Sequence, residues 1–276
     1  MDGVNVLLDE SGKKKGRPAE RPKGGDKEKD PNESPSAYKN AMVGSISFYG
    51  EVPVDEKTPQ RLCSIYTAHM PEDKAPTFKG WLEAELAAIH ARLPDGVVKV
   101  LINDGARNIW KYIEGNPLFD GYEQIVDYWH VVEHISLAAE ALFGKGSEEG
   151  KRWYKIHAKK LLEQVDGIKR VLRSIEYHQK TRTLSKARLE ALAIQRTFLE
   201  RNRDRMDYAG FRERGLPIGS GPVEAACKSI VKTRMCRSGM RWSRTGGQRI
   251  LDLRCYVKSN RWDAFWNQYK SLLQAA

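Results

Sequence analysis

The sequence predicts a mixed α/β fold in which strands and helices alternate before a long helical segment. Two short runs, 97–102 and 122–126, have the length and composition of buried strands, and each leads to an aspartate, Asp104 and Asp127. Three further strand candidates precede them, whereas residues 136–214 are almost entirely helix formers. The predicted order of elements is therefore βββαβαβ followed by helices.

The first three strands are predicted from apolar residues that alternate with polar ones. Residues 1–9 alternate in this way, with Asp2 at the very start, and residues 41–52 and 61–70 supply two more candidates. Three strands in succession favour an antiparallel meander. Residues 10–40 contain almost no apolar residue and are rich in Lys, Gly and Pro, so we expect a mobile basic loop there.

The first helix is predicted to start at Thr77, as its N-cap, and to end at a Pro-Asp-Gly sequence. A short helical stretch, 106–114, follows the fourth strand. After the fifth strand, residues 128–142 show a continuous helical pattern, which places Asp127 and His130 at a strand-to-helix junction. Polar side chains converge on ligands at the ends of strands in α/β proteins. These junctions are the predicted place for chemistry.

We divide the chain into three segments. Residues 1–135 are predicted to form the first part of an α/β core, with residues 136–214 as an all-helical insertion. Residues 215–276 are predicted to complete the core. They open on the helix breaker GLPIGSGP, and a helix follows that carries Glu224 in its first turn.

The composition indicates a globular protein without membrane or secretion signals. Of 276 residues, 40% are hydrophobic, which is enough to build a core. No apolar run of about 18 residues and no signal-peptide pattern is present, so we expect a soluble, cytoplasmic protein. The four cysteines include no Cys-x-x-Cys pair and are expected to be reduced and mostly buried. Trp110 and Trp129 are predicted core residues.

The net charge of +11 favours a polyanionic partner. Residues 151–214 contain 18 Lys and Arg against 8 Asp and Glu, and residues 224–270 contain 11 against 3. Aromatic residues lie among these charges, a mixture that suits a phosphate backbone and exposed bases, although a solvated helical surface is the simpler alternative. The basic turn SGMRWSRTGG and the residue before it supply the candidates for DNA contact: Arg237, Arg241, Trp242 and Arg244.

Four carboxylates lie at element boundaries: Asp2, Asp104, Asp127 and Glu224. Brought together they would repel one another unless cations neutralised them, so a cluster would indicate Mg²⁺ or Mn²⁺ with oxygen ligands. Two such ions are the usual device for attack on a phosphodiester. Each residue also has a structural alternative, because Asp-Gly pairs form turns, and acidic residues cap helices and face the helix dipole.

A βββαβαβ chain that ends in a helix with a carboxylate follows the ribonuclease H-like plan. The chain resembles bacterial insertion-sequence transposases of the DDE type, of the ISKra kind, which are related to the Mutator-like group. The matching segments cover nearly the whole chain: DGVNVLL at Asp2, NDGARNIW at Asp104, IVDYWHVVEHI at Asp127, GSGPVEAACKSIV at Glu224, and SGMRWS followed by RWDAFW.

The resemblance implies a catalytic triad of metal ligands, Asp2, Asp104 and Glu224, that binds two Mg²⁺ or Mn²⁺ ions. It also implies that Asp127 and His130 form an accessory D-x-x-H pair beside the active site. The implied function is cleavage and strand transfer of transposon DNA ends, that is, DNA recombination by transposition, with DNA and a second copy of the chain as partners and a nucleoid location. Because such transposases carry a DNA-recognition region before the first strand and only Met1 precedes Asp2, we expect a truncated chain.

Two other functions remain open from the sequence. The chain could be a catalytically inactive, DNA-binding remnant of a transposase. Alternatively, the sequence from His130 to His134 matches H-x-x-E-H, the inverted zinc-peptidase motif, in which two histidines one helical turn apart bind zinc and Glu133 activates water. The peptidase reading explains neither Asp127 nor the basic helices.

Overall fold

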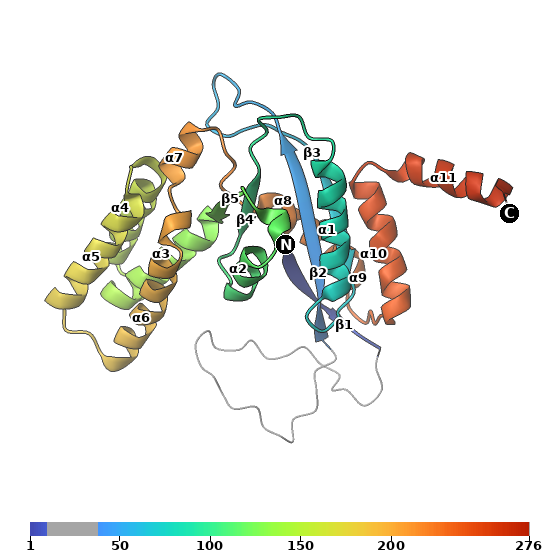
Figure 1. Ribbon diagram of the computed structural model, residues 1–276. Coiled ribbons are helices and arrows are strands. Elements are labelled where there is room, and N and C mark those ends of the chain that lie inside the picture. Colours follow the sequence, from blue (N-terminus) through green and yellow to red (C-terminus); the bar gives the residue numbers. More distant parts are fainter. Residues whose placement is uncertain (10–37, 276) are drawn as a thin grey trace. The chain divides into compact units, whose positions relative to one another are not determined.

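The computed structural model describes residues 1–9 and 38–275, and the chain divides into two compact units (Figure 1). Unit 1 comprises Met1–Gly50, Arg61–Asp95 and Gly221–Ala276, and unit 2 comprises Glu51–Gln60 and Gly96–Ser220. Most of the loop predicted at residues 10–40 lies outside the described residues. Its last three residues, 38–40, belong to a strand, so the predicted loop extends too far at that end.

The sheet of unit 1 is the predicted antiparallel meander. Its strands are β1 (Asp2–Leu7), β2 (Tyr38–Tyr49) and β3 (Arg61–His69), in the order β1-β2-β3. Val4 and Val6 of β1 are buried and the residues between and before them are not, which is the period-two pattern of a strand with one face on the core.

The first helix of unit 1, α1 (Pro76–His90), packs on β2 and β3 through its buried residues Phe78, Leu82 and Leu86. The predicted N-cap is wrong, because Thr77 already lies inside the helix. Its backbone N–H and its hydroxyl both donate to the carboxylate of Glu72, at 3.0 and 2.8 Å. A side chain outside the helix thus takes over the role of the cap.

The C-terminal helices complete unit 1. They are α8 (Gly221–Ala226), a π-helical turn η3 (Cys227–Lys232), α9 (Thr233–Met235), α10 (Arg244–Lys258) and α11 (Trp262–Ala275). Apolar residues of the first elements and of α10 join those of the sheet in one buried cluster, to which Val6, Val43, Ile230 and Leu251 belong. The last fifth of the sequence therefore supplies the helical layer that covers the first strands.

Unit 2 is built on a parallel pair of strands, β4 (Val100–Asn103) and β5 (Glu123–Val126). Between them lie α2 (Arg107–Glu114) and a 3-10 turn, η1 (Pro117–Phe119). The fourth strand was predicted to begin at residue 97, but Val97 and Val98 are exposed and precede the strand. The β-branched run in the sequence is therefore longer than the strand, which contains only the residues that pair with β5.

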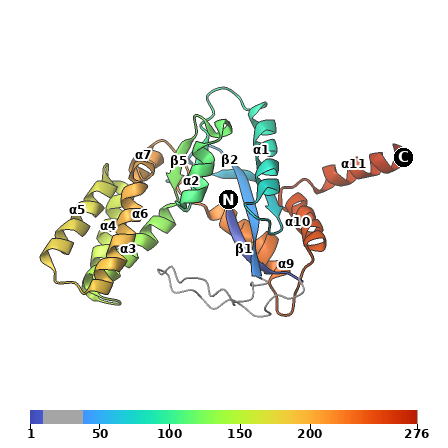
Figure 2. The same cartoon turned by 60° about the horizontal axis from the view of Figure 1, so that its bottom comes forward.

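Six helical elements follow β5 within unit 2: α3 (Tyr128–Phe143), α4 (Glu148–Glu163), α5 (Gly167–Thr181), α6 (Lys186–Arg201), η2 (Arg203–Arg205) and α7 (Tyr208–Glu213). Helix α3 packs against α4 and α6, with Ile135, Leu161, Leu192 and Leu199 fully buried. Figure 2 shows these helices side by side. None of the described helices is long and apolar enough to cross a membrane.

The predicted order βββαβαβ is confirmed along the chain, and so is the mixed α/β class. The described strands form a three-stranded antiparallel sheet and a two-stranded parallel sheet. A single ribonuclease H-like mixed sheet stays a prediction.

Two predictions about burial need correction. All four cysteines are free, but only Cys227 is buried, while Cys63 and Cys236 are exposed, so the thiols are not mostly buried. Trp110 is buried as predicted, whereas Trp129 is 64% exposed at the start of α3. Trp129 lies in the first turn of its helix, where a side chain has a neighbouring turn on one side only. Apolar periodicity therefore does not predict which side chains are buried there.

Candidate active site

Asp127 is a fully buried carboxylate that joins three segments of unit 2. It follows β5 directly and is the N-cap of α3, where its Oδ1 accepts hydrogen bonds from the backbone N–H groups of Trp129 and His130, at 2.6 and 3.1 Å. Its Oδ2 accepts a short hydrogen bond from the backbone N–H of Ser220. The capping alternative for Asp127 is therefore correct, and the same side chain also fastens the loop that leads to Ser220.

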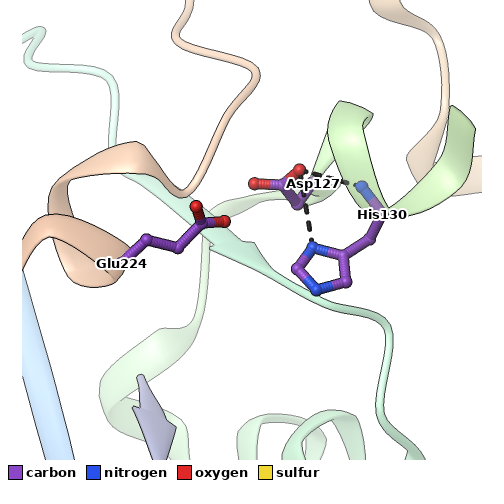
Figure 3. A group of neighbouring side chains, drawn as sticks. All are labelled: Asp127, His130 and Glu224. Atoms are coloured by element: carbon purple, nitrogen blue, oxygen red, sulfur yellow. Dashed lines mark hydrogen bonds and ion pairs between the residues drawn. The ribbon is translucent and has the colours of Figure 1, made fainter. Parts of the chain in front are cut away.

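His130 is the charged neighbour of Asp127 (Figure 3). Its Nδ1 lies 3.6 Å from Oδ1 of Asp127, and the side chain is partly exposed. This approach raises the pKa of His130 to about 8 against the opposing effect of burial, and the negative charges of Asp104 and Glu133 act in the same direction. His130 is thus largely protonated at neutral pH. Glu224, also drawn in Figure 3, belongs to unit 1.

Asp127 stays ionised although it is buried. Burial alone would raise its pKa, but the hydrogen bonds from His130 and Ser220 outweigh that effect and lower the pKa to about 2. The backbone N–H of Tyr128 also donates to the carbonyl of Ile218, at 3.0 Å. A buried anion and a main-chain hydrogen bond together fix the loop four residues before Glu224.

Asp104 lies in a tight turn at the end of β4. Its Oδ1 accepts a hydrogen bond from the backbone N–H of Ala106, at 3.0 Å, and Asn103 holds the N–H of Gly105 in the same way, at 2.9 Å. Gly105 has φ +82°, and a Cβ there would lie 2.8 Å from the ring of Phe198. Only glycine fits this position. The turn alternative for Asp104 is therefore correct, which does not exclude metal binding.

Asp2 and the helical stretch that carries Glu224 come together within unit 1. Asp2 is exposed at the start of β1, and its Oδ2 accepts a hydrogen bond from the thiol of Cys227, at 3.3 Å. Burial and the charge of Asp2 raise the pKa of Cys227 to about 12, so the thiol remains a donor. Cys227 follows Glu224 by three residues in the same helical stretch, where Glu224 is exposed in the first turn of α8.

No family model, curated protein or solved structure matches the chain.

Asp2 and Glu224 belong to unit 1, and Asp104, Asp127 and His130 belong to unit 2. Within either unit alone, the described residues include no group of three His, Cys, Asp or Glu side chains whose ligand atoms lie within 4.8 Å of one another.

The zinc-peptidase alternative finds no support in unit 2. Nδ1 of His134 lies 2.6 Å from Oε1 of Gln195, and the His134 ring stacks on Phe198 with a centroid distance of 3.6 Å. His130 meanwhile interacts with Asp127. The two histidines share a helix face but have different partners, and those partners account for both without zinc.

Among the four candidates for DNA contact, Trp242 is partly buried, whereas the three arginines are exposed. Arg237 and Arg241 are exposed, and Nε of Arg237 donates to the carbonyl of Thr233, at 3.0 Å. Trp242 packs on the core of unit 1, and its Nε1 donates to the carbonyl of Met235, at 3.2 Å. Arg244, the first residue of α10, makes a short hydrogen bond to the carbonyl of Pro71. Arg237 and Arg241 are thus the better placed for a phosphate backbone.

A second basic surface, on α5, was not singled out from the sequence. Arg170, Arg173 and Tyr177 are all exposed and follow one another at spacings of three and four residues, which places them on one side of the helix. Nearby lysines pair with carboxylates, for example Lys180 with Glu176 at 2.7 Å. The spacing of arginine and tyrosine is the signal in the sequence that would have identified this surface.

Proposed function

We propose that the chain is the catalytic core of a DDE transposase that cleaves and joins the ends of transposon DNA. The observation that carries this proposal is the contact of Asp2 with Cys227, which brings the first strand against the helical stretch of Glu224 from opposite ends of the sequence. A catalytic carboxylate on the first strand and another on a late helix belong to the ribonuclease H-like plan, which we propose for the core.

Mg²⁺ or Mn²⁺ suits the carboxylates of this chain. Asp2 and Glu224 are exposed and Asp104 is partly exposed, so their oxygens can bind a hard cation without the cost of uncovering a buried group. When bound, such ions supply activation of the attacking oxygen and stabilisation of the leaving one.

The other residues of the site have supporting roles in this proposal. Asp127 is hydrogen-bonded on both oxygens and fully buried, so it acts as a positioning residue that fixes the chain ahead of Glu224. His130, protonated at neutral pH, provides a positive charge beside Asp104 that favours an approaching phosphate. The exposed arginines of α5 and of residues 237–241 bind the DNA backbone. The active protein is a homodimer that acts on DNA in the cytoplasm, because two transposon ends must be held together.

The test is Mn²⁺-dependent nicking of supercoiled plasmid DNA by the full chain, with Mn²⁺ binding measured separately. Asp2→Asn, Asp104→Asn and Glu224→Gln should each lower nicking at least about 1,000-fold, because each removes a charged ligand. Glu213→Gln removes an exposed carboxylate at the end of α7 and should leave the rate unchanged. Nicking retained by Asp104→Asn, with the fold intact by circular dichroism, would contradict the proposal.

An inactive DNA-binding remnant is the second candidate, and the exposed basic surfaces favour it because they do not need the carboxylates. Such a protein binds DNA without Mg²⁺ or Mn²⁺ and does not nick it. DNA binding that is equal in the wild type and in Asp104→Asn, together with no nicking by either, would select this alternative.

A further inference from the structure

The last helix of unit 1, α11, carries an uncovered apolar stripe. None of its described residues is buried, and in Figures 1 and 2 the helix extends away from the rest of unit 1. Five of its large side chains are between 36% and 63% exposed. At about 100° per residue the apolar side chains share one side of the helix, opposite Asn267 and Ser271. The stripe consists of Trp262, Phe265, Trp266, Tyr269, Leu272 and Leu273.

The aromatic rings of the stripe contact other aromatic rings of the same chain. Phe265 packs on Tyr256 of α10, with a centroid distance of 4.6 Å, and Trp266 contacts Trp262 and Tyr269, each at 5.5 Å. Rings that already hold one another lose little rotamer freedom when a surface covers them. The stripe is therefore prepared for binding.

The charges of α11 indicate what kind of surface covers the stripe. The helix is neutral in a chain of net charge +11, since its only charged residues are Asp263 and Lys270. A neutral helix is not a natural site for a polyanion. Lys270 is its only basic residue, whereas helices that lie on anionic membranes are rich in Lys and Arg on their polar side. Asp263 and Lys270 are seven residues apart and so flank the same edge of the stripe.

We propose that α11 pairs in antiparallel orientation with α11 of a second copy of this chain. A two-fold axis that reverses one helix relative to the other keeps the charged edges on the same side, so Asp263 of each copy lies opposite Lys270 of the other. A parallel pair puts these edges on opposite sides and forms neither ion pair. The antiparallel arrangement alone matches the apolar stripe and the charge pattern together.

The proposed interface is small. The exposed parts of the stripe amount to roughly 500 Å² in each copy, or on the order of 1,000 Å² for the pair, which is near the lower limit for a specific interface. The structure thus assigns to α11 a reversible, concentration-dependent self-association. This association is independent of transposase activity and requires no DNA.

Sedimentation velocity of the full chain, over a roughly 100-fold range of micromolar concentrations and without DNA, tests the association. The wild type should pass from monomer to dimer. Leu272→Glu combined with Leu273→Glu should raise the dissociation constant at least about tenfold, because charge enters the stripe. Asn267→Glu combined with Ser271→Glu adds the same charge on the opposite side and should not change it. A wild type that stays monomeric throughout overturns the proposal.

Charge reversal tests the orientation. Asp263→Lys and Lys270→Asp should each weaken the dimer, and the two together should restore it, because each ion pair is then re-formed with its signs exchanged. A dimer that the single reversals leave unchanged, or that the double reversal does not restore, overturns the antiparallel arrangement. Binding of the chain to phosphatidylcholine vesicles without self-association assigns the stripe to a lipid surface instead and also overturns it.

Discussion

A buried anion such as Asp127 survives only where the protein replaces the water that it has lost. Main-chain N–H groups of Trp129, His130 and Ser220 do so here, and the ring of His130 adds a positive charge. Two of these donors come from α3, and one comes from a loop far along the chain. The hydrogen bonds to this one carboxylate therefore hold the two segments at a fixed distance from each other.

The Asp127–His130 pair makes stability depend on pH at both ends of the range. The pKa of His130 is raised from 6.5 to about 8, so its contribution is complete below pH 6.5 and is lost as the pH rises through 8. The pKa of Asp127 is lowered from 3.8 to about 2, so its contribution is complete above pH 3.8 and is lost as the pH falls through 2. Stability from the pair is therefore greatest between these windows.

Asp127→Asn should lower the free energy of unfolding by about 2 to 3 kcal/mol, because one amide oxygen cannot accept all three backbone bonds. The same substitution should return the pKa of His130 to 6.5 or below, measured by NMR titration of its ring proton. Glu133→Gln removes only an exposed charge and should change that pKa far less. A His130 pKa that stays near 8 in Asp127→Asn would contradict the assignment of Asp127 as its main partner.

At the residue scale, the sequence predicts what is local. Asp127 as an N-cap follows from a strand end next to a helix start, and the pairing with His130 follows from their spacing. Ser220 as a partner could not be predicted, because it is separated from Asp127 by five helices and donates through its backbone, which every non-proline residue has. The orientation of Trp129 depends equally on distant packing.

Helix α5 shows that the number of basic residues in a helix does not tell which of them pair with carboxylates. Several of the lysines on α4 and α5 pair with carboxylates three or four residues away, as Lys151 does with Glu148 at 2.7 Å, so these charges partly cancel. Arg170 and Arg173 are exposed on one side of α5 with Tyr177 between them and the C-terminus. The arrangement favours binding of a phosphate backbone by arginine with a base stacked on tyrosine.

Arg170→Ala combined with Arg173→Ala should weaken DNA binding and reduce the slope of log affinity against log salt by about 2, because two phosphate contacts are lost. Fluorescence anisotropy with a labelled duplex at several salt concentrations measures both. Lys151→Ala combined with Lys180→Ala removes the same charge from paired residues and should have the smaller effect. Equal effects of the two variants would show that only net charge matters.

Element boundaries show where periodicity is insufficient. The break between α4 and α5 was not predicted, because residues 164–166 contain neither proline nor glycine. Asp166 there has φ +57°, and a Cβ at Gly167 would lie 2.6 Å from the carbonyl oxygen of Lys160. The break is therefore set by the close approach of α4 and α5. The only sign of this contact in the sequence is Gly167.

At the scale of the whole molecule, neither unit is continuous in sequence. Unit 2 nevertheless receives almost all its residues from 96–220, and its described core, with Ile135 and Leu199, lies within that segment. A fragment of residues 96–220 should therefore keep its helical circular dichroism and unfold cooperatively on heating. A fragment of residues 1–95 lacks the layer that covers Val4 and Val6 and should not. A non-cooperative transition in the first fragment would contradict the division.

The order of elements was predictable because each helix or strand has a local pattern in the sequence. The pairing of strands, in contrast, is decided by residues far apart in the chain. The alternation in β1 specifies a strand with one buried face, but it does not specify that Val43 lies opposite Asp2. The same limit applies to the candidate site, where Asp2 and Cys227 could be suspected as strand and helix residues but not as partners.

The late position of the covering helices also has a consequence in time. On the ribosome, β1, β2, β3 and α1 are complete before residues 96–220 of unit 2 are made, and α8 to α10 emerge only after residue 220. Protein synthesis adds about 5 to 20 residues per second. The apolar face with Val4, Val6 and Val43 therefore stays uncovered for on the order of 10 s before these helices are made. During synthesis this half-built sheet is the part of the chain most in need of a chaperone.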